Sequence, residues 1–224
     1  MGITRNMFIL AAGLIIGGWL GARYDTAVRT WIYGSDLAAQ YQHRVDVLER
    51  FGSCREFVFY GDSQVEYGPW DHAFGGRVGN FGVSSDKAAG VLARMDTECS
   101  SHLVLLIGVN DVRARVPDDD FVSTIQAIFA ATRGDIFLIE IMPVAGDHAR
   151  WNPDLARVNR RLEEICEGRC TWVPTWDVLA KDGVLRSEFT RDGLHLTSAG
   201  YALLVERVAM ALNLPLLPSR AGTD

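Results

Sequence analysis

Short apolar runs that stop at glycine or proline alternate with longer segments of helical periodicity along most of this chain. The clearest run is His102–Ile107, which stops at Gly108 and is typical of a fully buried strand. Four similar runs should also form strands: Phe57–Tyr60, Val78–Phe81, Ile136–Ile141 and Thr171–Val173. Because helical segments separate the runs, the strands should be mostly parallel and joined by right-handed crossovers. The sequence therefore predicts an α/β fold, a three-layer α/β/α sandwich around a five-stranded sheet.

The segments between the strands carry the apolar spacing of amphipathic helices. Helices are expected at residues 86–97, from Pro117, from Asn152 and over Thr197–Leu212. Proline and the acidic trio Asp118, Asp119 and Asp120 suit the first turn of a helix. A metal site built from that trio is the weaker interpretation, because side chains at successive helical positions point in different directions.

Length and charge narrow the classes of function. A chain of 224 residues suffices for one well-buried domain and a short appendage. Its formal net charge is −6 and no basic run offsets it, so the phosphate backbone of a nucleic acid would be repelled. The sequence has no Cys-x-x-Cys motif and no paired histidines, so we expect neither a metal site nor a cofactor.

The N-terminus carries a separate signal. Arg5 precedes the uncharged apolar stretch Met7–Ala22, which Arg23 closes. The stretch is between a signal-peptide core and a full span in length, so residues 1–23 should form an uncleaved signal-anchor, with a cleaved signal peptide or a buried helix as alternatives. The domain would then face a bacterial periplasm, held at the inner membrane or released there if the signal is cleaved. The strip of Gly13, Gly17 and Gly21 would also permit a homodimer in the bilayer.

The remaining chain divides into three parts. We expect a helical stem at residues 24–52 that includes a helix capped by Ser35, a folded domain at 53–215 and a C-terminal tail at 216–224.

The four cysteines could form two disulfides in an exported protein. Cys54 and Cys99 each precede a predicted strand, so they can pair if those two strands are neighbours. Cys166 and Cys170 would close a small loop. Four reduced thiols are the alternative, because sequence does not fix connectivity.

Polar motifs follow the predicted strands. They are Gly61-Asp62-Ser63, Asn80-Phe81-Gly82-Val83-Ser84, Gly108-Val109-Asn110-Asp111 and, before the final helix, Asp192-Gly193-Leu194-His195. In α/β folds, functional groups gather beyond the carboxyl ends of the strands. The four motifs should therefore meet at one edge of the sheet.

These motifs contain every group that acyl transfer requires. Ser63 is the candidate nucleophile, His195 the general base and then acid, and Asp192 the carboxylate that orients the imidazole. The backbone N–H groups of Ser63 and Gly82 and the side-chain amide of Asn110 are the candidate oxyanion donors. Glycine at position 82 would let its N–H approach a substrate without a Cβ in the way.

The motifs GDS, N-x-G-x-S, G-x-N-D and D-x-x-H occur in the order found in the SGNH/GDSL hydrolase family, which this sequence resembles over residues 56–212. The flanking segments are similar to bacterial platelet-activating-factor acetylhydrolase-like esterases. The resemblance implies a flavodoxin-like sheet of order 2-1-3-4-5 and metal-free hydrolysis of ester, thioester or amide-linked acyl groups. It also makes the first and third strands neighbours, which supports a Cys54–Cys99 bridge.

The sequence departs from the family at two positions near the motifs. Ser85 stands where many members have a second glycine, and could cap the next helix. Gln64 follows the nucleophile and could narrow the pocket or bond the substrate. Asp62 and Asp111 are expected to brace their own turns.

Further residues are candidates for contact with substrate. Tyr67, Pro69 and Trp70 follow the nucleophile closely enough to line the acyl or leaving-group side, although Trp70 could equally pack under the loop. His148 could form a wall of the pocket from the loop after the fourth strand. Gln64, Trp70 and His148 are therefore the predicted substrate-binding residues.

Three functions are compatible with these features. The first is an esterase that removes short acyl groups, acetyl above all, from a small-molecule, carbohydrate or lipid ester. The second is an acyltransferase that passes the acyl group to an envelope glycan. The third is a non-enzymatic, membrane-anchored module, which the full set of catalytic groups disfavours.

Overall fold

The computed structural model describes residues 36–98 and 101–218. The chain divides into two compact units, Met1–Arg44 and Val45–Asp224. Residues 36–44 are helical in the first unit, and helical residues 45–51 begin the second. The predicted signal-anchor and its glycine strip lie outside the described residues. None of the helices in the described ranges combines the length and apolar character that a bilayer span requires.

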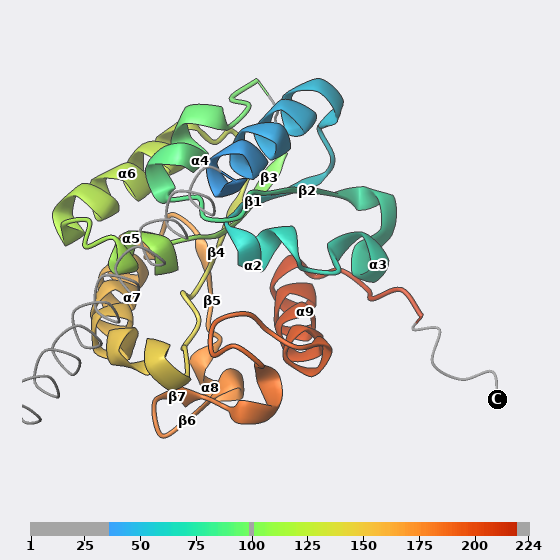
Figure 1. The fold of residues 1–224 in the computed structure, drawn as a ribbon. Coiled ribbons are helices and arrows are strands. Elements are labelled where there is room, and N and C mark those ends of the chain that lie inside the picture. The colour runs from blue at the N-terminus through green and yellow to red at the C-terminus, as the bar shows by residue number, and fades with distance from the viewer. Residues whose placement is uncertain (1–35, 99–100, 219–224) are drawn as a thin grey trace, which may run out of the picture. The chain divides into compact units, whose positions relative to one another are not determined.

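Five parallel strands form the central sheet in the order β2-β1-β3-β4-β5, which confirms the predicted fold class (Figure 1). The strands are β1 Phe57–Gly61, β2 Val78–Gly82, β3 His102–Leu106, β4 Ile136–Ile139 and β5 Thr171–Val173. Gly61 pairs with Gly82 on one side and with Leu106 on the other. The carboxyl ends of the three strands that precede the polar motifs are therefore level with one another.

Helices cover both faces of the sheet, and each face has its own hydrophobic core (Figure 1). Phe57 and Phe59 of β1 belong to one core and Val58 and Tyr60 to the other, as the alternation of side chains along a strand requires. The first core includes residues of α2 Ser63–Glu66, α3 Trp70–Phe74, α8 Trp176–Leu179 and α9 Ser198–Leu212. The second includes residues of α4 Ala88–Arg94, α5 Val109–Arg113, α6 Asp118–Ala131 and α7 Asn152–Cys166.

The five strands of the sheet and the long helices match the sequence prediction, whereas the short helices and the small hairpin were missed. The helix expected at residues 86–97 is shorter, spanning Ala88–Arg94. Short helices α2, α3, α5 and α8, the hairpin of β6 Ala180–Lys181 and β7 Val184–Leu185, and the 3-10 helices Gly75–Arg77, Gly146–Trp151 and Ser187–Phe189 were not predicted. These elements are too short to show a hydrophobic period, so local capping and tertiary packing determine them.

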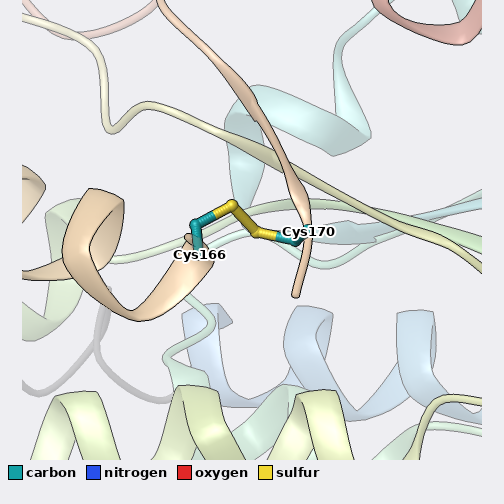
Figure 2. The surroundings of a disulfide bond; sticks show 2 residues. All are labelled: Cys166 and Cys170. Atoms are coloured by element: carbon teal, nitrogen blue, oxygen red, sulfur yellow. A yellow bond between two sulfur atoms is a disulfide. The ribbon is translucent and has the colours of Figure 1, made fainter. Parts of the chain in front are cut away.

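Cys166 and Cys170 form a disulfide at the C-terminal end of α7, just before β5 (Figure 2). Their Cα atoms are 4.9 Å apart. The bond closes the turn in which the Cys170 N–H also donates to the Cys166 carbonyl at 2.9 Å. The second proposed bridge involves Cys99, which lies outside the described residues, so the Cys54–Cys99 pairing stays a prediction.

Candidate active site

A tight turn after β1 places Ser63 at the carboxyl edge of the sheet. Ser63 is the first residue of α2, and Asp62 caps that helix: its carboxylate accepts the Gln64 N–H at 2.9 Å. The carbonyl of Asp62 accepts the N–H groups of Val65 and Glu66. Since Ser63 begins the helix, its own N–H has no acceptor within α2 and points out of the first turn.

Two hydrogen bonds link Ser63, His195 and Asp192. Ser63 Oγ lies 3.0 Å from His195 Nε2, although the two residues are 132 positions apart in the sequence. His195 Nδ1 lies 2.6 Å from Asp192 Oδ2. The three predicted residues are therefore brought together in the order that nucleophile, base and orienting carboxylate require.

The Asp192 carboxylate also organises the turn that carries His195. Its Oδ1 atom accepts the N–H groups of Leu194 at 2.9 Å and His195 at 2.8 Å. Partial burial alone would raise the pKa of Asp192, but hydrogen bonds from the His195 ring and from these two N–H groups outweigh it and hold that pKa well below its ordinary value. Asp192 therefore stays ionised beside the imidazole.

The backbone N–H of Gly82, predicted to be an oxyanion donor, is used within the protein instead. Its N–H donates to Asn80 Oδ1 at 2.9 Å, and the residue is buried. A Cβ at this position would lie 2.1 Å from the backbone nitrogen of Glu66. Glycine is thus required so that α2 can pack against the end of β2, and the N–H of Gly82 is occupied within the protein.

The next turn instead exposes the N–H of Ser85. The N–H of Asp86 donates to the Val83 carbonyl at 3.1 Å, and Ser85 has a φ of +67°, as the third residue of a type II turn does. The Ser84 N–H donates to the Glu66 carboxylate at 2.6 Å. Ser85 is exposed, and no acceptor for its N–H lies within bonding range among the described residues.

The side chain of Asn110 lies between the Ser63 and Ser85 turns. Asn110 follows Gly108, whose φ of +134° turns the chain from β3 into α5. Asn110 Nδ2 donates to the Asp86 carbonyl at 3.0 Å and lies 3.5 Å from Asp62 Oδ2. The predicted amide therefore reaches residues adjoining both Ser63 and Ser85.

Two buried carboxyl groups support these turns: Asp62 braces its own turn, as expected, whereas Asp111 bonds to the start of α4. Burial raises the pKa of Asp62 to about 7, although its hydrogen bond from Gln64 opposes the shift. Burial likewise raises the pKa of Asp111 to about 6, and this carboxylate accepts the Ala88 N–H that begins α4. Within residues 36–98 and 101–218, no three His, Cys, Asp or Glu side chains are grouped so as to hold a metal ion.

A family comparison accounts for this arrangement. Residues 58–203, well over half of the chain, match the model of the GDSL-like lipase/acylhydrolase family. The chain belongs to this family. It is therefore a GDSL-like hydrolase, and the family resemblance read from its motifs is confirmed.

Solved structures of similar fold agree with this assignment. A Streptococcus pneumonia protein provisionally named as a platelet activating factor has 25% identity and a TM-score of 0.74, over 83% of this chain and 99% of that one. A GDSL-like lipase from Bacteroides thetaiotaomicron has 18% identity and a TM-score of 0.61, over 81% and 95%. An acetylxylan esterase from Geobacillus stearothermophilus has 17% identity and a TM-score of 0.59, over 75% and 98%. No curated protein sequence matches the chain.

In this GDSL-like hydrolase, Gln64 is buried and ties two turns together. Its side-chain Nε2 atom donates to the Leu194 carbonyl at 2.6 Å, and its backbone carbonyl accepts a hydrogen bond from the Tyr201 hydroxyl at 2.9 Å. A cavity of about 10 Å³ adjoins it, lined in part by Asp62 and Val109. The hydrogen bonds of Gln64 therefore go to the protein, and its contact with substrate stays a prediction.

Trp70 corrects the prediction that it lines the substrate pocket. Its side chain is fully buried, its indole N–H donates to the Val65 carbonyl at 2.8 Å, and its ring centroid lies 4.6 Å from that of Phe59. Trp70 belongs to the core beneath the nucleophile turn. The alternative stated for it, packing under the loop, is the correct one.

Tyr67 and His148 form two parts of the rim of the hydrolase site. The Tyr67 ring is exposed and its centroid lies 5.3 Å from that of His195. His148, in the 3-10 helix Gly146–Trp151, lies against the turn that carries His195: a Cβ on Gly193 would lie 3.4 Å from His148 Cδ2. The sequence places Arg150 and Trp151 in the same loop as His148, but sequence reasoning missed Arg113 of α5, whose guanidinium carbon lies 5.0 Å from the centroid of the Trp151 ring.

Proposed function

We propose that this GDSL-like hydrolase is a serine esterase that removes short acyl groups, acetyl above all, from an ester of a carbohydrate or lipid. The observation that carries the proposal is the linked pair of hydrogen bonds from Ser63 to His195 and from His195 to Asp192. This arrangement fits acyl transfer because it joins a nucleophile, a base and a group that fixes the base's tautomer.

The proposed reaction has two steps. The Ser63 oxygen attacks the acyl carbon while its proton moves to His195 Nε2, and the alcohol leaves with that proton as the acyl-serine ester forms. Water then attacks the acyl-serine, gives its proton to His195, and the acid departs as the serine recovers its proton. Asp192 accepts a hydrogen bond from Nδ1–H throughout and stabilises the imidazolium that forms in each step.

Three donors could stabilise the oxyanion in both steps. They are the N–H of Ser63 at the start of α2, the exposed N–H of Ser85 and the side-chain amide of Asn110. Removing one such donor costs about 100- to 1,000-fold in turnover in a comparable site. The bond of Asn110 Nδ2 to the Asp86 carbonyl at 3.0 Å would set the orientation of this amide before substrate binds. Its second N–H, whose contact with Asp62 is long at 3.5 Å, would turn to the oxyanion.

A structural neighbour supports a short acyl group. An acetylxylan esterase from Geobacillus stearothermophilus shares the fold of this chain, with a TM-score of 0.59. Acetyl esters are therefore the first substrates to test.

Solvent access favours water over a sugar as the acyl acceptor. The side chains of His195 and Asp192 are 30% and 54% exposed, so water reaches the base directly. An acyltransferase would use the same triad, and adding a sugar acceptor to the assay and analysing the product distinguishes the two reactions.

The experiment is hydrolysis of p-nitrophenyl esters from acetyl to octanoyl by the full-length protein, with Ser63→Ala as the control. We expect p-nitrophenyl acetate to be hydrolysed fastest, and the Ser63→Ala variant to lose at least about 1,000-fold in kcat. Activity that does not exceed that of Ser63→Ala on any chain length would refute the proposal.

A further inference from the structure

Four residues form a basic, aromatic surface beside the proposed active site: Arg113, His148, Arg150 and Trp151, here called the basic ledge. The Arg113 and Arg150 guanidinium carbons lie 5.0 and 4.8 Å from the centroid of the Trp151 ring. The His148 ring stacks on the same indole, with centroids 5.0 Å apart and planes 20° apart. Cation–π contact and stacking thus gather two positive charges around one indole.

The basic ledge adjoins both chemical ends of the site. At one end, Arg113 Nη1 donates to Asn110 Oδ1 at 3.4 Å, next to the proposed oxyanion donors. At the other, the Ala145 N–H donates to the Gly193 carbonyl at 2.7 Å, which holds the segment before His148 against the turn of Asp192 and His195. A substrate bound at Ser63 would therefore place part of its alcohol half near the ledge.

The arginines of the basic ledge form no ion pair in the described residues, although the Arg113 charge also acts on the buried carboxyl group of Asp62. Arg113 and Arg150 are both exposed. Arg157 and Arg161 on the neighbouring helix α7 differ, since they pair with Asp118 and Asp119.

Two guanidinium groups held at one indole concentrate positive charge on this surface, and a bound anion would offset that charge. Guanidinium also matches the planar geometry of carboxylate and the oxygens of phosphate. A neutral sugar would gain neither effect. The arrangement is thus better suited to a charged alcohol than to an uncharged one.

We propose that the basic ledge binds a carboxylate or phosphate on the alcohol half of the substrate, so that the preferred ester is carried by an anionic molecule. This inference rests on the proposed esterase function and names its substrate class. The acyl carbon lies at Ser63, and the anionic alcohol lies toward Arg113 and Arg150.

The test compares three acetyl esters of related phenols: methyl 4-acetoxybenzoate, which is neutral, 4-acetoxybenzoate and 4-acetoxyphenyl phosphate. The full-length protein should show a higher kcat/KM for the anionic esters than for the neutral one. The measured quantity is the ratio of kcat/KM for an anionic ester to kcat/KM for the neutral ester. Arg113→Met and Arg150→Met should each lower this ratio about fivefold, the upper range for an exposed ion pair. High salt should lower the ratio in the native protein through screening.

Arg160→Met is the matched control, because Arg160 is exposed on α7 and its loss changes the net charge equally. The control should leave the ratio unchanged. Arg150→Met gives the cleaner result, since within the described residues Arg113, and not Arg150, is hydrogen-bonded to Asn110. The relative rates of the two anionic esters show whether carboxylate or phosphate is preferred.

A ratio of one or less in the native protein, or an unchanged ratio in both arginine variants, overturns the proposal. Loss of hydrolysis of all three esters would refute the esterase function instead. In that case, binding of 4-acetoxybenzoate and its methyl ester to Ser63→Ala, measured by calorimetry, decides the ledge separately: equal affinity for the two overturns it, and tighter binding of the anion supports it.

Discussion

Replacing Gln64 with leucine should separate the position of His195 from the stability of the fold. Gln64 Nε2 donates to the Leu194 carbonyl at 2.6 Å, so one hydrogen bond joins the neighbour of the nucleophile to the neighbour of the base. Leucine is close in size and has no donor. The substitution removes this bond while Ser63, His195 and Asp192 all remain.

The cost to stability follows from burial. Gln64 and Leu194 are 4% and 9% exposed, so water does not readily replace the lost donor. A buried acceptor without a partner costs about 1–3 kcal/mol. The native Gln64 Oε1 is itself buried and unpartnered within the described structure, and its removal offsets part of that cost. We expect the free energy of unfolding to fall by about 1–2 kcal/mol.

Gln64→Leu should lower kcat even though most of the protein remains folded. A displacement of about 1 Å in a reacting group can cost 100-fold, so kcat should fall about 10- to 100-fold with little change in KM. The assay is hydrolysis of p-nitrophenyl acetate beside urea unfolding of the same samples.

Tyr201→Phe is the control for the Gln64 experiment. This change removes the hydroxyl that donates to the backbone carbonyl of Gln64 at 2.9 Å, and it leaves the hydrogen bond from Gln64 Nε2 to Leu194 intact. Its stability loss should be about 1 kcal/mol. A native kcat in Gln64→Leu, or an equal fall in both variants, would show that Gln64 does not position His195.

Other positions give further expected outcomes. Ser85→Pro removes the N–H and is incompatible with the φ of +67°, so kcat should fall about 100-fold or more, whereas Ser85→Gly should remain active; equal activity of the two excludes this donor. The pKa of Asp62 is raised to about 7, from about 3.9 in an unfolded chain. The folded state therefore binds more protons between these values, and the free energy of unfolding should fall as pH rises from about 4 to 7. Asp62→Asn should flatten that slope in urea titrations; an unchanged slope contradicts the assignment. Trp70→Ala should lower the free energy of unfolding by about 3–5 kcal/mol, as a core residue does; a stability loss below about 1 kcal/mol would place it outside the core. Mass spectrometry of the mature protein should find Met7–Ala22 retained, and its absence rules out an anchor.

The sequence was informative where a pattern was long or where several motifs agreed. Helices α6, α7 and α9 have periodic apolar faces, and β3 is an unbroken apolar run, so their positions follow from burial alone. The grouping of Ser63, Asp192 and His195 could be predicted because parallel strands bring their carboxyl ends to one edge.

Gly82 at the end of β2 and Ser85 in the following turn show why other parts of the site were missed. Glycine can indicate either close packing or a left-handed backbone, and sequence alone does not say which. Gly82 serves the first purpose, while Ser85 adopts the left-handed conformation without being glycine. Arg113 of the basic ledge was missed for a different reason, since it lies on α5 and meets Trp151 from a segment distant in sequence.

The separation of Ser63 and His195 in the sequence has a consequence for folding. Their hydrogen bond joins residues 132 positions apart, and His195 lies in the turn just before the last helix. Contacts of such sequence separation require closure of a long loop, which is entropically costly and slow. The neighbouring strands β1 and β2 can pair earlier, because a shorter connection joins them. Recovery of hydrolysis during refolding should therefore report docking of the C-terminal segment, and it should lag behind spectroscopic signals from the sheet.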